Sequence, residues 1–190
     1  MEVNLLDYTY TPVEFIGMVA AKCYDGKTDT ESNKRRATHC KDSGHLAVLR
    51  FSYATFEING ISRVCSHQLV RVAHAGILQA SARYIKQTNI EYVVPESLPT
   101  ELKQEWGAIL KSSSDMYQKA LDAGMSKGDA RYILPQGCTT SLNMTGNFQM
   151  WRDLLKNRTH KAADWEVRQV AIQIQNHLNQ IAPEIFDKIC

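Results

Sequence analysis

The chain has 190 residues, of which 44% are hydrophobic and 22% are charged, and its formal net charge is +2. This length suffices for one domain with a sizeable core, and the composition is that of an ordinary soluble globular protein. The small net charge argues against the broad single-sign surface that nucleic-acid or membrane binding needs. We therefore expect neither partner, and any positive surface should be a local pocket.

The start of the chain and its hydropathy predict a cytoplasmic protein. Residues Met1 to Asn4 do not form a basic region followed by an apolar run, so no secretory signal is expected. No stretch approaches about 18 consecutive apolar residues, so no membrane-spanning helix is expected. The odd number and wide scatter of the cysteines predict free thiols in a reducing compartment and no metal site. These cysteines are Cys23, Cys40, Cys65, Cys138 and Cys190.

Two helices are predicted near the start of the chain. Thr11 is a suitable cap, Pro12 suits the first helical position, and Glu14 completes a capping box. About ten helical residues should follow this start. A second, polar helix is predicted from Thr30 to Lys41.

The next segment changes to β-branched and aromatic residues. Residues Ala47 to Ile58 predict a strand, and Asn59-Gly60 predicts a tight turn after it. Ser62 can then cap a helix, and residues Gln79 to Ile90 are expected to be extended. The apolar residues assigned to that helix are Val64, Leu69, Val72, Ile77 and Leu78.

The second half of the chain reads as mostly helical. An amphipathic stripe from Leu102 to Leu121 predicts a helix closed by Gly124. A short segment from Lys127 to Tyr132 and a helix near residues 148–155 follow. The final helix carries Val167, Val170, Ala171, Ile174, Leu178 and Ile181 on one face. With no repeat or linker, these elements predict one α+β domain.

Polar residues gather in three clusters that suit an anion. His67, Gln68 and Arg71 are predicted to share one helical face, and Gln79, Ser81 and Arg83 one side of a strand. Guanidinium groups with amide and hydroxyl donors match phosphate oxygens, although solvated or ion-paired arginines remain an alternative. The other clusters surround Arg131 and run from Asn143 through Asn147 and Arg158 to Arg168, where spacing favours Trp165 in the core and Glu166 in an ion pair.

Taken in order, these clusters resemble the flavin-dependent thymidylate synthase family over nearly the whole chain. The matching segments are Leu5-Leu6-Asp7-Tyr8, Thr11-Pro12, Cys23-Tyr24, Ser43-Gly44-His45, Gly60-Ile61-Ser62-Arg63, His67-Gln68-Leu69-Val70-Arg71, Ser81-Ala82-Arg83-Tyr84, Ala130-Arg131-Tyr132-Ile133-Leu134-Pro135, Asn147, Arg158 and Trp165-Glu166. Each segment is short, but their order and separations are specific. The resemblance implies a single α+β domain over residues 1–190, with an antiparallel or mixed sheet flanked by several helices.

The resemblance also implies a reaction. Family members attach a one-carbon unit to carbon 5 of dUMP, with methylenetetrahydrofolate as carbon donor, reduced FAD as hydride donor and NADPH as reductant. Arg158 and Arg131 would be catalytic. The resemblance places the Arg158 guanidinium at the pyrimidine edge, where it stabilises charge that develops on the ring, and assigns the grip on phosphate and sugar to Arg71, Arg83 and Arg131. The family is a homotetramer whose active sites are shared between subunits, so Arg71 could serve a neighbouring subunit's nucleotide.

The family's binding residues are carried over position by position. The residues implied to bind the nucleotide are Gln68, Arg71, Gln79, Ser81, Arg83, Arg131 and Arg158, and those implied to contact the cofactor are His45, Arg71 and Asn147. No metal ligand is implied.

The chain departs from the family's signature, which is Arg-His-Arg, seven residues, and then Ser. Arg71 and Ser81 keep its ends, but Val72 and Ala73 stand where His and Arg are expected. On a helix, His74 would point about 200° away from position 72, so we do not expect it to replace the missing side chain. Further substitutions are Ala47 for a hydroxyl residue, Arg50 for a glutamate and Asp153 for an asparagine. The positions that contact flavin and folate are substituted except for His45 and Asn147, whereas the nucleotide positions are kept except for Gln79, which replaces a common acid.

Two alternatives follow from these departures. An enzyme that has lost the reductive step would let water capture the intermediate and would form a 5-hydroxymethyl nucleotide from dUMP or dCMP. A non-catalytic relative would bind the nucleotide without exchanging its C5 proton. The choice between uracil and cytosine stays open, with Asp153 and Asn157 as candidate selecting residues.

Overall fold

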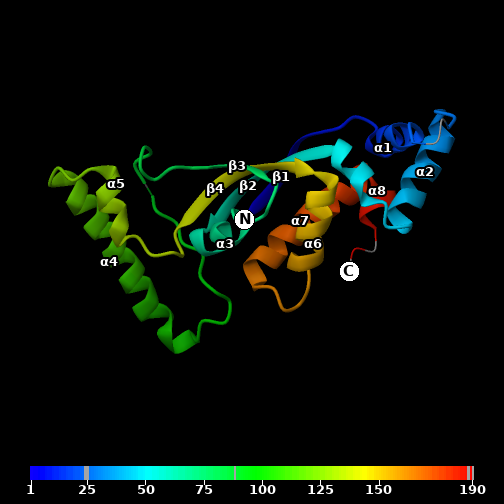
Figure 1. The fold of residues 1–190 in the computed structure, drawn as a ribbon. Coiled ribbons are helices and arrows are strands. Elements are labelled where there is room, and N and C mark those ends of the chain that lie inside the picture. The colour runs from blue at the N-terminus through cyan, green and yellow to red at the C-terminus, as the bar shows by residue number, and fades with distance from the viewer. Residues whose placement is uncertain (24–25, 88, 188, 190) are drawn as a thin grey trace.

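The computed structural model describes residues 1–23, 26–87, 89–187 and 189 and shows one α+β domain (Figure 1). Two positions used in the sequence analysis lie outside the described residues. They are Tyr24, which belongs to one segment of the family resemblance, and Cys190, which is predicted to be a free thiol. In chain order, the elements are β1 (Glu2–Tyr8), α1 (Pro12–Ala21), α2 (Thr30–Asp42), the 3-10 helix η1 (Leu46–Phe51), β2 (Tyr53–Ser62), α3 (Arg63–Leu69), β3 (Gly76–Gln79), the 3-10 helix η2 (Thr100–Leu102), α4 (Lys103–Asp122), α5 (Lys127–Ala130), the 3-10 helix η3 (Arg131–Ile133), β4 (Thr139–Asn147), α6 (Phe148–Arg158), α7 (Trp165–Ile181) and α8 (Pro183–Phe186).

The described sheet is antiparallel and has the strand order β1-β2-β4-β3. Strand β4, which the sequence analysis did not assign, lies between β2 and β3. Its last residue, Asn147, is opposite Tyr53 at the start of β2, and its Thr145 is opposite Gly76 at the start of β3. The starts of β2 and β3 therefore meet the end of β4 at one edge of the sheet.

The core lies between the sheet and the helices α6 and α7, which pack against it (Figure 1). Trp151 of α6 is fully buried, and its indole nitrogen donates to the Ala54 carbonyl at 3.1 Å. Its ring meets that of Phe56 edge-on at 5.0 Å between centroids. The predicted apolar face of α7 is confirmed, because Val167, Val170, Ala171, Ile174 and Leu178 are buried and Ile181 packs partly buried against the same core. This packing fixes α6 on β2.

The five longer helices that the sequence predicts are confirmed: those after Pro12, from Thr30 to Lys41, from Leu102 to Leu121, near residues 148–155 and along the face from Val167 to Ile181. The details of the first helix start are not confirmed. Thr11 has a left-handed backbone (φ 44°), and its side chain makes no capping hydrogen bond. The Glu14 carboxylate instead accepts from the Thr30 hydroxyl at 3.4 Å and lies 3.6 Å from the Lys34 ammonium. A tertiary contact with α2 has replaced the local capping box.

The strand predicted from Ala47 to Ile58 is only partly correct. Residues Leu46–Phe51 form a 3-10 helix, and β2 begins at Tyr53. Asn59-Gly60 is not a hairpin turn, because β2 runs through it with a register shift between Ile58 and Ile61. The positive φ of Gly60 (67°) is used for that bulge.

The helix predicted after Ser62 is shorter than its apolar pattern implied. Ser62 does cap it, since its hydroxyl accepts from the Cys65 amide at 3.0 Å, but α3 ends at Leu69. Ile77 and Leu78 belong to β3, which ends at Gln79. The prediction of an extended segment from Gln79 to Ile90 is therefore wrong, because the described residues after Gln79 form turns and bends. His67, Gln68 and Arg71 therefore do not share a helical face, and Gln79, Ser81 and Arg83 do not share one strand. Residues 72–74 lie beyond the helix, so the 200° argument against His74 is wrong.

Candidate active site

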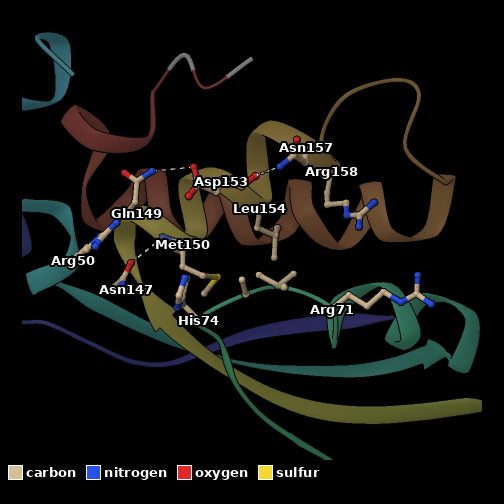
Figure 2. Close-up of a pocket in the computed structure, with 12 residues that line it drawn as sticks. Arg50, Arg71, His74, Asn147, Gln149, Met150, Asp153, Leu154, Asn157 and Arg158 are labelled. Atoms are coloured by element: carbon tan, nitrogen blue, oxygen red, sulfur yellow. Dashed lines mark hydrogen bonds between the residues drawn. The ribbon is translucent and has the colours of Figure 1, made fainter. Parts of the chain in front are cut away.

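A cavity of about 790 Å³ lies where β4 passes into α6. Its lining comes from η1, from the loop between α3 and β3, from the last residue of β4 and from α6 (Figure 2). The lining residues are Arg50, Arg71, Val72, Ala73, His74, Asn147, Gln149, Met150, Asp153, Leu154, Asn157 and Arg158. This volume is in the usual range for a site that holds a small molecule.

Helix α6 orients one wall of the cavity. Asn147 caps this helix, because its side-chain oxygen accepts from the Met150 amide at 2.9 Å. From that start, Met150, Leu154 and Arg158 follow at four-residue spacing and face the cavity together. The cap leaves the Asn147 amide nitrogen available as a donor at the same end of the helix.

The cavity is positively charged. Arg50, Arg71 and Arg158 line it against one carboxylate, that of Asp153. One oxygen of Asp153 already accepts from the Gln149 amide at 2.9 Å. Three guanidinium groups in a recess of the surface attract anions, and their paired N–H groups match phosphate or carboxylate oxygens. The positive surface is therefore a local pocket, and it suits the anion that the arginine clusters of the sequence predict.

Three of the predicted site residues, Arg71, Asn147 and Arg158, lie in this cavity. Within one chain the other predicted residues lie elsewhere. Gln68 donates to the Asp164 carboxylate at 2.5 Å, and Gln79 donates to the hydroxyls of Ser66 (3.0 Å) and Thr140 (3.2 Å). His45 is exposed at the start of η1 and does not line the cavity.

Arg83 and Arg131 form a second pair of arginines beside α5. The Arg131 side chain donates to the Gly128 carbonyl at 3.1 Å, and a Cβ on Gly128 would lie 3.5 Å from Cγ of Arg83. Ser81 is next to them, where its hydroxyl accepts from the Arg83 amide at 3.4 Å. Helix α5 stands at the far end of the molecule from α6 (Figure 1). One chain therefore holds two separate arginine pairs.

Glu166 has a structural contact that the sequence analysis did not anticipate. Its buried carboxylate accepts from the Ser62 amide at 2.7 Å and from the Ser62 hydroxyl at 2.5 Å, so the predicted ion pair is wrong. Trp165 beside it is half-buried. Burial, with Glu166 nearby, raises the pKa of the Cys65 thiol to about 12. Cys65 is therefore no nucleophile at neutral pH, and the described cysteines are free thiols as predicted.

Several cavity residues were not assigned a role from the sequence. His74, Gln149, Met150 and Leu154 line the cavity, although the sequence predicts no role for them. The four-residue spacing of Met150, Leu154 and Arg158 on a predicted helix was an available signal. Among the described residues, no group of three or more His, Cys, Asp or Glu side chains could hold a metal ion, and no helix is long and apolar enough to cross a membrane.

Comparisons with known proteins agree over nearly the full length. A family model described as "Thymidylate synthase complementing protein" (Thy1) matches residues 4–184. The chain is 35% identical to the flavin-dependent thymidylate synthase of Pyrococcus furiosus over 185 residues, which covers 90% of this chain and 76% of the relative. It is 31% identical to the enzyme of the same name from Mycobacterium avium over 195 residues, covering 92% of this chain and 77% of that relative.

Proposed function

The chain belongs to the flavin-dependent thymidylate synthase (Thy1) family, and we propose on that premise that it transfers a one-carbon unit to carbon 5 of dUMP to form dTMP. The observation that carries this proposal for the chain itself is the cavity in which Arg71 and Arg158 line one space with Asn147. These three residues come from sequence segments that are far apart. Their convergence is what a nucleotide site requires.

Arg158 is assigned the central catalytic role. It projects from the last turn of α6 toward the cavity (Figure 2). Carbon 5 of uracil becomes nucleophilic as negative charge spreads onto the ring oxygens and N3, and a preorganised guanidinium at that edge stabilises the charge. Arg71, which lines the same space, is assigned to the nucleotide phosphate, because its forked donors match phosphate oxygens.

The cavity also fits a flavin. Its guanidinium groups suit phosphates, the amide of Asn147 can donate to a ring acceptor, and Val72, Met150 and Leu154 provide apolar surface for a flat ring. When bound, reduced FAD supplies the hydride that completes the methyl group, methylenetetrahydrofolate supplies the carbon, and NADPH restores the reduced flavin. His45 lies outside the cavity of its own chain.

We further propose that a second copy of the chain completes the site. The pair Arg83 and Arg131, with Gln79 and Ser81, would come from one subunit, and the cavity with Arg71 and Arg158 from its neighbour. Helix α4 supports this arrangement, because much of its apolar stripe is exposed: Ile109 is 59% exposed and Trp106 is 41% exposed. An apolar helix face of this kind normally packs against a partner. A homotetramer with shared sites is the assembly that the family resemblance implies.

The test is formation of dTMP by the purified chain supplied with dUMP, FAD, NADPH and methylenetetrahydrofolate. Arg158→Gln should lower kcat by about a hundredfold, the usual cost of losing a donor that acts on developing charge. Arg35→Gln, which changes an exposed arginine on α2 outside the cavity, should leave kcat unchanged. The proposal fails if the wild-type chain forms no product at high concentration, or if it binds dUMP without exchanging the C5 proton.

A 5-hydroxymethyl product is the second candidate, and one observation favours it. Val72 and Ala73 line the cavity at the two positions where the family signature has His and Arg. Without those polar groups the reductive step could fail, and water would capture the intermediate. Mass spectrometry separates the candidates, because the hydroxymethyl nucleotide is one oxygen atom heavier than the methyl product. Both dUMP and dCMP are to be supplied, since the Asp153 carboxylate in the cavity could accept from the cytosine amine.

A further inference from the structure

The strand pairing brings two further cationic or polar side chains to the end of β4. Arg50 lies three residues before β2, and His74 lies two residues before β3. Because β4 lies between these strands and ends at Asn147, the segments that precede them flank Asn147 from opposite sides. Both Arg50 and His74 line the cavity. The sheet topology therefore creates a group that no local sequence pattern contains.

Arg50, His74 and Asn147 lie apart from Arg71 and Arg158, the two arginines assigned to the nucleotide. Figure 2 shows Arg50, Asn147 and His74 at one end of the cavity and Arg71 at the other, with the Arg158 side chain toward the Arg71 end. The cavity therefore has two basic ends. One phosphate of a nucleoside monophosphate can occupy only one of them, so the second end is suited to an anion on another ligand.

Two features strengthen the Arg50 end as an anion position. Asn147 is the N-cap of the eleven-residue helix α6, so the positive end of this helix dipole lies beside Arg50 and His74. His74 also has a left-handed backbone (φ 65°), which is uncommon for a residue other than glycine. This conformation belongs to the loop that carries the imidazole to the cavity. An exposed arginine is normally just solvated, but Arg50 lines a recess together with these groups.

We propose that Arg50 and His74, with the start of α6, bind a phosphate group of the ligand that shares the cavity with the nucleotide. Under the proposed function, on which this inference rests, that ligand is a flavin nucleotide and the phosphate belongs to its dinucleotide or mononucleotide tail. Ala73 has no guanidinium, and Arg50 supplies a positive charge to the same cavity from a different segment. The chain thus retains phosphate binding by residues outside the family signature.

The experiment measures flavin binding rather than turnover. FAD, FMN and riboflavin, which carry two, one and no phosphate groups, are titrated by fluorescence into the wild type, Arg50→Gln, Arg50→Lys and His74→Asn. Asparagine tolerates the left-handed backbone, so His74→Asn removes the ring while preserving the loop. Arg35→Gln is the matched surface control, and melting curves confirm that each variant is folded.

Arg50→Gln is expected to weaken FAD binding by about tenfold or more, the usual effect of losing a charged hydrogen bond. His74→Asn should weaken it less, Arg50→Lys should retain part of the affinity, and riboflavin binding should not change. Equal FAD affinities in the wild type and both neutral variants would overturn the inference, as would an equal loss for riboflavin. A wild-type chain that binds dUMP but no flavin also overturns it and leaves nucleotide binding intact. If the FAD losses occur but no dTMP forms, the proposed reaction fails and the phosphate position stands.

Discussion

Ser62 connects three parts of the molecule through a single side chain. Its hydroxyl accepts from the Cys65 amide at the start of α3 and donates to the Glu166 carboxylate at the start of α7. The Ser62 amide donates to the same carboxylate. Because α3 leads into the loop that carries Arg71, this buried contact supports one wall of the cavity. The capping role of Ser62 follows from local sequence, but its partner Glu166, 104 residues away, does not.

Ser62→Ala should lower the free energy of unfolding by about 1–3 kcal/mol. The change removes the α3 cap and leaves one oxygen of a buried carboxylate without a donor. Urea unfolding at neutral pH measures this loss. Ser112→Ala on the exposed side of α4 is the control and should stay within about 0.5 kcal/mol of the wild type. A similarly small effect for Ser62→Ala would mean that the contact does not stabilise the fold.

At the scale of the elements, local patterns account for the helices better than for the strands. The long helices follow from apolar residues at helical spacing and from their end signals. Strand β4 alternates buried Leu142 and Met144 with polar residues, which is a strand pattern. The pattern is weak because these are the only two large apolar side chains in the strand. The pattern that appeared to extend α3 to Leu78 combined a helix, a loop and a strand. Pairing with β4, which is a non-local contact, ended that ambiguity.

The contact between α1 and α2 depends on one glycine. A Cβ at Gly17 would lie 1.9 Å from the Asn33 backbone oxygen, so Gly17→Ala must push these helices apart. We expect a loss of at least about 1–3 kcal/mol in the free energy of unfolding. Gly107→Ala in α4, where nothing lies within 4 Å of the new Cβ, should instead add about 0.5–1 kcal/mol. Changes of opposite sign in the free energy of unfolding, measured by urea unfolding, would confirm the tight crossing of α1 and α2. A Gly17→Ala variant as stable as the wild type would contradict it.

At the scale of the whole molecule, the separation of the two arginine pairs is the main feature. Helices α4 and α5 extend away from the sheet, while the cavity lies beside α6 (Figure 1). A single chain therefore cannot present Arg131 and Arg158 to one nucleotide in this arrangement. The proposed oligomer resolves the separation by placing the α5 region of one subunit at the cavity of another.

Mixing inactive variants tests the shared site. Arg131→Gln and Arg158→Gln should each have low activity, but co-expressed hybrids should recover up to about a quarter of the wild-type rate, because some sites receive both intact arginines. The pair Arg71→Gln and Arg158→Gln should show no recovery, since both residues line the cavity of the same chain. Recovery is measured as dTMP formation. Equal behaviour of the two mixtures would contradict a site built from two subunits.

The main helices, the α+β class and a basic site for an anion could all be inferred before the fold was known, because periodicity, caps and clusters of arginines are properties of short segments. The membership of the cavity could not. Arg50, His74 and Asn147 are neighbours because antiparallel pairing aligns the starts of β2 and β3 with the end of β4. Arg83 and Arg131 are separated from Arg158 because the tertiary arrangement places α5 far from α6 (Figure 1). Long-range pairing and packing, which are set by the free energy of the whole core, place these side chains.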